Sequence, residues 1–269
     1  MAIRKLAKTS NSQNVNILQS EFIRMNTITH EELLDAGVHF GHMTHKWNPA
    51  MAPYIFMKKD GIHIIDVLKT QKMLEEAQRV VKQLSKSGRK ILFVGTKKQA
   101  REILEEYARS VGMPFITERW LGGMLTNFAT VRKSVRKMSN LDKLVTGDNA
   151  VNISKKEKLM ISRNWGKLDR VFGGIADMAK LPAALFIVDS LKEHIAIAEA
   201  KRLNIPTIAI VDTNSNPNSV DFPIPANDDS TKSIEFITKC LVEAIKEGNA
   251  ERKTDKETEE EKETANTKD

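Results

Sequence analysis

The sequence predicts an α/β fold, in which a parallel sheet carries helices on both faces and an antiparallel pair of helices is inserted. Two observations predict the sheet. Short apolar segments recur along the chain, and they alternate with segments whose apolar residues repeat every three or four positions. A third observation predicts the insertion, because about 65 residues in the middle of the chain keep the helical repeat with no strand between them.

Five segments have the apolar character of β-strands. Residues 90–94 (KILFV) form a continuous apolar run, which is typical of a strand buried on both faces of a parallel sheet. Because helical segments separate these strands, we expect them to run parallel. The predicted strands are 62–66 (IHIID), 90–94, 114–117 (PFIT), 183–189 (AALFIVD) and 206–212 (PTIAIVD).

Helices are predicted from a capping motif and from apolar stripes. Thr29 and Glu32 match a capping box, so a short helix should begin there. Cys240 lies beside the last apolar stripe and is expected to be a buried core thiol. The stripes are Leu74, Ala77, Val81 and Leu84; Ala100, Ile103, Leu104, Tyr107 and Val111; a helix through Leu203; and Ile234, Ile237, Leu241 and Ile245.

The central insertion has two heptad seams. Apolar residues repeat at intervals of three, four and three from Phe128 to Met138, and at intervals of four and three from Ile161 to Ile175. The turn-rich segment 146–152 (TGDNAVN) separates them. This pattern predicts an antiparallel, coiled-coil hairpin. The seam residues are Phe128, Val131, Val135 and Met138, then Ile161, Trp165, Leu168, Phe172 and Ile175.

These elements define the expected domains. The α/β domain comprises residues 25–118 and 183–248, and the hairpin occupies 119–182 between them. Residues 1–24 are polar and lack a hydrophobic repeat, while residues 249–269 are highly charged and poor in apolar side chains. Both ends are therefore predicted to be disordered.

Composition excludes some classes of protein and favours others. The chain has 269 residues and one cysteine, so no disulfide framework exists within a monomer, and no apolar run approaches the ~20 residues that span a bilayer. We therefore expect a soluble cytoplasmic protein. Residues 119–170 hold twelve Lys and Arg against four acidic residues, an excess slightly larger than the +7 of the whole chain. Such a concentration indicates a polyanionic partner, most often nucleic acid, although a solvated helix face explains it equally well.

The segment GVHFGHMTHKWNP, residues 37–49, contains His39, His42 and His45. Three histidines can hold zinc, but their spacing matches no known metalloenzyme motif. Some of the rings could instead be packed or hydrogen-bonded to the backbone. Because Lys46 and Trp47 follow directly, we favour a basic and aromatic contact loop that suits phosphate and sugar, or a protein partner.

An enzyme is one alternative to these binding functions. Gly95, Thr96 and Lys97 follow a strand and precede a helix, so they could bind a phosphate at the helix N-terminus, but neither glycine-rich nucleotide motif occurs in the chain. Acidic residues end three predicted strands, at Asp66, Asp189 and Asp212, where they are either catalytic or ordinary helix caps. A phosphate-binding enzyme and a protein scaffold with a basic hairpin therefore stay open as alternatives.

Several long motifs resemble one family, bacterial ribosomal protein two of the small subunit. The resemblance runs from about residue 25 to residue 248. It rests first on the helix that leads into GVHFGH and on PAALFIVDSLKEHIAIAEAKRLNIP at 182–206. The motifs RWLGGMLTN (119–127), GGIADM (173–178) and VDTNSNP (211–217) follow the same order as in the family.

This resemblance implies a flavodoxin-like sheet of five parallel strands with a protruding helical hairpin. It implies a structural constituent of the small ribosomal subunit that acts in translation, without catalysis, cofactor, small-molecule substrate or membrane association. Its implied partners are small-subunit rRNA and other small-subunit proteins, including the large RNA-binding protein one, on the cytoplasmic ribosome.

The loop, the 119–127 motif and the hairpin together supply the candidate contacts to rRNA or protein. We assign no catalytic residue and no metal ligand. The candidate contact residues are His39, His42, His45, Lys46, Trp47, Arg119, Trp120, Asn127, Arg132, Lys133, Arg136, Lys137, Lys155, Lys156, Lys158, Arg163 and Lys167.

Overall fold

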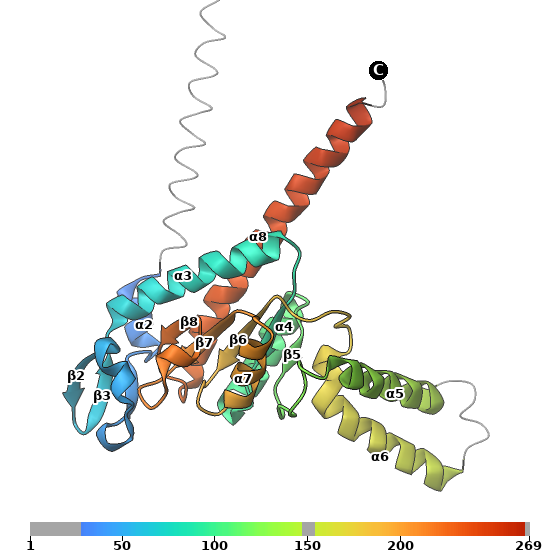
Figure 1. Ribbon diagram of the computed structural model, residues 1–269, viewed down its shortest axis with the longest axis horizontal. Helices are drawn as coiled ribbons and strands as arrows, with labels where there is room; N and C mark the ends of the chain where they lie inside the picture. Colours follow the sequence, from blue (N-terminus) through green and yellow to red (C-terminus); the bar gives the residue numbers. More distant parts are fainter. Residues whose placement is uncertain (1–27, 147–153, 267–269) are drawn as a thin grey trace, which may run out of the picture.

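The fold is that of a computed structural model, which describes residues 28–146 and 154–266 (Figure 1). The N-terminal segment 1–24 and nearly all of the loop 146–152 lie outside the described residues, so the predictions for them stay predictions. A parallel sheet occupies the centre of the molecule. The helices α5 and α6 project from one end of it, and a small second sheet lies at the other end (Figure 1).

The central sheet has five parallel strands in the order β5-β4-β6-β7-β8. In chain order this is 2-1-3-4-5, the flavodoxin-like arrangement, which confirms the predicted fold class. Four of the strands lie where the sequence placed them. The strand bounds are Ile91–Val94 for β4, Phe115–Ile116 for β5, Ala184–Val188 for β6, Thr207–Val211 for β7 and Phe222–Pro225 for β8.

The predicted strand 62–66 does not belong to this sheet. Its residues form β3 (Ile62–Ile65), which pairs antiparallel with β1 (Phe40–Met43) and β2 (Ile55–Lys59) in a separate three-stranded sheet. The fifth parallel strand is β8, which was not predicted because it contains two prolines (FPIP). Proline removes a ladder donor, yet an edge strand such as β8 tolerates it.

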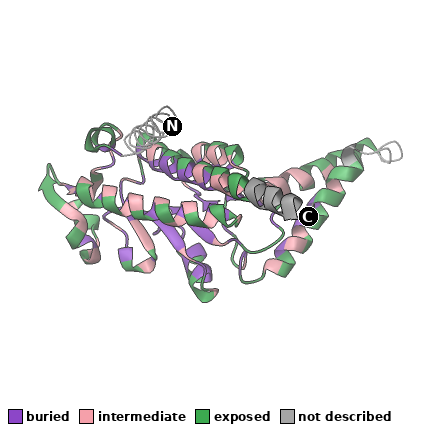
Figure 2. Ribbon diagram, turned by 90° about the horizontal axis from the view of Figure 1, so that it is seen from above, coloured by how far each residue is buried: buried purple, intermediate pink, exposed green. Residues whose placement is uncertain are grey.

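Helices cover both faces of the parallel sheet. The buried sides of α3, α4 and α8 pack on one face, while α7, the base of the α5–α6 hairpin and Met51 pack on the other. Alternate strand residues point to these two cores, and Figure 2 shows the buried strands between the exposed helix surfaces. The helices are α2 (His30–Asp35), α3 (Val67–Lys86), α4 (Lys98–Ser110), α7 (His194–Arg202) and α8 (Thr231–Asn266), with short 3-10 helices at Thr44–Lys46, Pro49–Tyr54, Gly173–Ile175 and Pro217–Ser219.

Several local predictions are confirmed. The capping box of Thr29 and Glu32 is present at α2, and Cys240 is buried. Helix α8, however, continues to Asn266, although disorder was expected from residue 249. Glu, Lys, Arg and Ala favour a helix there, and Lys82 of α3 pairs with Glu251 of α8 at 2.9 Å. No helix within the described ranges is long and apolar enough to cross a membrane.

The inserted helices are α5 (Phe128–Thr146) and α6 (Lys155–Phe172), which lie side by side as an antiparallel pair (Figure 1). Val131, Val135 and Met138 of the predicted seam are buried between them and the sheet. A capping box of Ser154 and Glu157 starts α6. The hairpin is therefore confirmed, whereas its supercoiling and its outer boundaries at 119 and 182 stay predictions.

Candidate nucleic-acid interface

The outer faces of α5 and α6 carry a set of exposed basic side chains. The seam of each helix turns inward, so the residues between the seam positions point to solvent. The cations are spread along most of the length of the arm, as contacts to a nucleic-acid backbone require. The exposed members of the predicted set are Lys133, Arg136 and Lys137 on α5 and Lys155, Lys156, Lys158, Arg163 and Lys167 on α6.

Arg132 differs from these residues. Its side chain is half-buried, and its guanidinium donates a hydrogen bond to the backbone carbonyl of Met178 at 2.9 Å. Arg132 therefore ties α5 to the segment that follows the hairpin. A structural role fits this contact better than the predicted contact to an external partner.

The arm is attached to the domain through one buried carboxylate, Glu199 of α7. Trp120 donates its indole N–H to this carboxylate at 3.1 Å. The backbone N–H groups of Gly123, Leu125 and Thr126 donate to it at 2.7, 2.9 and 3.0 Å, and the Thr126 hydroxyl adds a fifth bond at 3.1 Å. Burial opposes the charge on Glu199, but these donors outweigh it and lower the pKa of the carboxyl.

Two predicted contacts in the 119–127 motif change their meaning as a result. Trp120 is buried, so its ring is not free to stack on a base, and the expectation of an outward contact is wrong. Arg119 and Asn127 are exposed beside it, and Asn127 accepts a hydrogen bond from the Thr130 hydroxyl at the start of α5. No local pattern indicates the role of Glu199, because its donors lie more than 70 positions away.

The three histidines of the 37–49 loop do not converge. His39 is half-buried next to the ring of Phe40, and burial lowers its pKa. His45 and Lys46 are exposed, and the Trp47 ring lies 5.8 Å from the Lys58 ammonium. Within the described parts of the chain, the only group of side chains arranged to hold a metal includes His42 alone of the three. A zinc site of His39, His42 and His45 is therefore not formed.

The small sheet and the loop before it present a mixed apolar and basic face. Phe56 is 70% exposed, and Met43 and Met57 are exposed as well. Lys46, Lys58 and Lys59 are exposed in the same segment. Large apolar side chains that gather in this way mark a surface that contacts another molecule.

The candidate phosphate loop at Gly95–Lys97 is occupied by the chain's own acids. Glu193 accepts hydrogen bonds from the backbone N–H and the hydroxyl of Thr96, at 3.1 and 2.5 Å. The Lys97 ammonium lies 2.6 to 3.2 Å from three carboxylates, those of Asp189, Asp228 and Asp229. These carboxylates outweigh the cost of burial and raise the pKa of Lys97. An incoming phosphate would have to displace them, so the hypothesis of a phosphate-binding enzyme loses its site.

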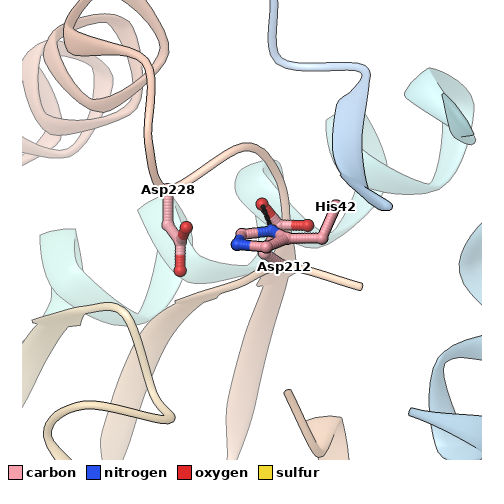
Figure 3. Close-up of side chains that lie close together, drawn as sticks. All are labelled: His42, Asp212 and Asp228. Carbon is pink, nitrogen blue, oxygen red and sulfur yellow. Dashed lines mark ion pairs between the residues drawn. The ribbon is translucent and has the colours of Figure 1, made fainter. Parts of the chain in front are cut away.

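We call His42, Lys97, Asp189, Asp212, Asp228 and Asp229 the strand-end cluster. His42 comes from β1, and its Nδ1 atom lies 2.9 Å from Asp212 (Figure 3). The hydrogen bond and charge of Asp212 raise the pKa of His42, and burial raises that of Asp228 to about 7. Of the acids that end predicted strands, Asp66 caps α3 and Asp189 accepts from the N–H groups of Leu191 and Lys192, as helix caps do.

A doubly wound α/β domain whose nucleotide position is filled by its own side chains, and which projects a basic helical arm, has the features of a structural protein with a polyanionic partner. Comparison with known proteins agrees with this class. The family described as Ribosomal protein S2 matches residues 33–248, and the chain belongs to that family. It is therefore a structural ribosomal protein and not an enzyme.

Individual relatives are similar over most of their length. The small ribosomal subunit protein uS2 of Cytophaga hutchinsonii is 58% identical over 230 residues, which cover 86% of this chain and 91% of the relative. The proteins of the same name from Parabacteroides distasonis and Porphyromonas gingivalis are 55% and 56% identical, covering 86% of this chain and 84% and 83% of the relatives. These comparisons confirm the family that the motifs indicated.

Proposed function

We propose that this chain is a structural constituent of the small ribosomal subunit that contacts rRNA with the outer faces of α5 and α6. The observation that carries this proposal is the exposure of eight cationic side chains on an arm whose opposite faces are buried. Phosphate contacts need cations that reach outward without unpacking the protein, and these side chains meet that need. The family and the names of the relatives support the ribosomal setting, which in bacteria is the cytoplasm.

The small sheet serves a second contact in this proposal. Its exposed Phe56, Met43 and Met57 suit an apolar protein partner better than a phosphate backbone, and Lys58 and Lys59 suit an acidic rim. We assign this face to neighbouring small-subunit proteins. The large RNA-binding protein one is the partner that the family resemblance suggests.

Crosslinking in cells tests both assignments together. Ultraviolet irradiation, digestion and sequencing would identify the peptides that carry rRNA fragments and those joined to other proteins. We expect rRNA on peptides from 133–137 and 155–167, and protein crosslinks on peptides from 43–59. If rRNA were attached to the small sheet alone, the arm would have to be reassigned to a protein partner.

A further inference from the structure

We propose that His42, Asp212 and Asp228 hold a divalent transition-metal ion of the zinc type, which fastens β1 to the carboxyl ends of β7 and β8. This site is separate from the basic arm and from the small-sheet face, and it does not depend on contact with rRNA.

The three residues come from three elements that are far apart in the sequence. His42 lies in β1, Asp212 follows β7, and Asp228 follows β8. Each offers one ligand atom, and these atoms lie within 4.8 Å of one another (Figure 3). They meet outside the carboxyl ends of the parallel strands, where α/β sheets characteristically bind their ligands.

Two carboxylate oxygens in this group have unused capacity. Oδ2 of Asp228 is completely buried and accepts no hydrogen bond from any described residue, although Oδ1 of the same carboxylate is engaged by Lys97 at 2.6 Å. Oδ2 of Asp212 is also buried, and apart from the His42 ring no described donor serves it. A buried carboxylate oxygen without a partner is costly, and a cation is one of the few groups that satisfy it.

The charge of the strand-end cluster points the same way. Four aspartates face a single ammonium, that of Lys97, so the cluster is left with a charge of −3 when His42 is neutral. Asp189, Asp212 and Asp228 are all buried, where unbalanced charge is expensive. The same excess contributes to the raised pKa of Asp228. A divalent cation would remove most of this imbalance.

The donor set selects the kind of ion. One imidazole nitrogen with two carboxylate oxygens suits Zn²⁺ and its first-row neighbours, whereas Mg²⁺ and Ca²⁺ prefer oxygen alone. Oδ2 of Asp229 lies 3.3 Å from Nε2 of His42, close enough to take a further position.

The site would add to an existing junction between the two sheets. The N–H of His42 donates to the Thr213 hydroxyl at 2.8 Å, and the N–H of Asn48 donates to the Thr213 carbonyl at 2.7 Å. Gly41 packs so closely that an added Cβ would lie 2.6 Å from Thr213 Cγ2. A metal bridging β1, β7 and β8 at this point would hold the small sheet rigidly in place.

Zinc titration of the full-length protein tests the proposal. The protein would be stripped with a chelator, and Zn²⁺ alone would be added in a calorimeter, with Mg²⁺ as a comparison. We expect one Zn²⁺ per chain, binding in the micromolar range or tighter, and a Zn²⁺-dependent rise in Tm. His42→Gln and Asp228→Asn should each weaken binding by at least about tenfold. The matched control His45→Gln changes an exposed histidine three positions away and should bind as the wild type does.

Circular dichroism would show whether each variant folds. If Asp228→Asn did not fold, His42→Gln would decide, because His42 is only half-buried. The proposal would be overturned by an absence of saturable Zn²⁺ binding to the wild type, by unchanged affinity in His42→Gln, or by loss of binding in His45→Gln.

Discussion

Reversing charge on the basic arm should weaken rRNA binding without unfolding the domain. We would replace Lys133, Lys137, Lys155 and Lys158 by Glu, all of which are exposed and lie off the buried seam. Arg132 is left unchanged because it donates a hydrogen bond to Met178. Exposed substitutions change stability by about 0.5 kcal/mol or less each, and a like-charged pair four positions apart on α5 costs a similar amount.

The size of the effect follows from the number of cations removed. Removing one cation that neutralises a phosphate reduces the slope of log K against log salt by about 0.7 to 0.9. If all four side chains bind phosphates, the slope falls by about 3, and the affinity at roughly 0.1 M salt falls by about three orders of magnitude. If fewer of them bind phosphates, both quantities scale down together, so the slope counts the phosphates bound independently of the affinity.

Filter binding of the purified protein to small-subunit rRNA across a salt series measures both quantities. The control replaces Lys72, Lys98, Lys232 and Lys239 by Glu, which makes the same change in net charge on α3, α4 and α8. The affinity of the control should fall much less, because those lysines lie away from the arm. Equal reductions in the two variants would show that only overall charge matters. A folded arm variant with unchanged slope would refute the reasoning.

Three other outcomes can be checked on the isolated protein. Glu199→Gln should lower the free energy of unfolding in urea by at least about 2 kcal/mol, since an amide cannot accept from all the N–H groups around it. Because the pKa of Glu199 is lowered in the folded state, its contribution is present at neutral pH and is lost as pH falls through that folded value. The difference between wild type and variant should therefore shrink in acid. The Cys240 thiol, whose pKa burial raises to about 12, should react with iodoacetamide at pH 8 at least about a thousandfold more slowly in the native protein than in denaturant; rapid labelling of native protein would contradict its burial. Calorimetry with common nucleotides should show no binding tighter than about 1 mM, and a stronger, saturable signal abolished by Lys97→Ala would restore the enzyme hypothesis.

The elements that could be predicted correctly from sequence are those whose signal is local. The capping box at Thr29, the stripe of α3 and the seam from Val131 to Met138 each depend on spacings of three or four residues. The β8 strand was missed because its edge position excuses two prolines, and an edge position is a property of the whole sheet. Strand 62–66 was assigned to the wrong sheet for the same reason, since pairing partners are not written in the strand itself.

The candidate site shows the same division. Exposure of the arm's lysines follows from a helical repeat and could be predicted. The strand-end cluster could not, because it joins His42 to Asp212 and Asp228 across more than 150 positions. The burial of Trp120 was also hidden, because its partner is a carboxylate on a helix made much later in the chain.

The mooring of the arm to Glu199 also sets an order of events during synthesis. The donors between Trp120 and Thr126 precede Glu199 by 79 to 73 positions. At about 5 to 20 residues per second, that separation is roughly 4 to 15 seconds of translation. Helices α5 and α6 are complete within this interval and can pair along their seam, because they need no later residue to do so. The arm of a nascent chain is thus able to form before its direction is fixed, and chains halted before residue 199 should carry a folded arm with no set orientation to the sheet.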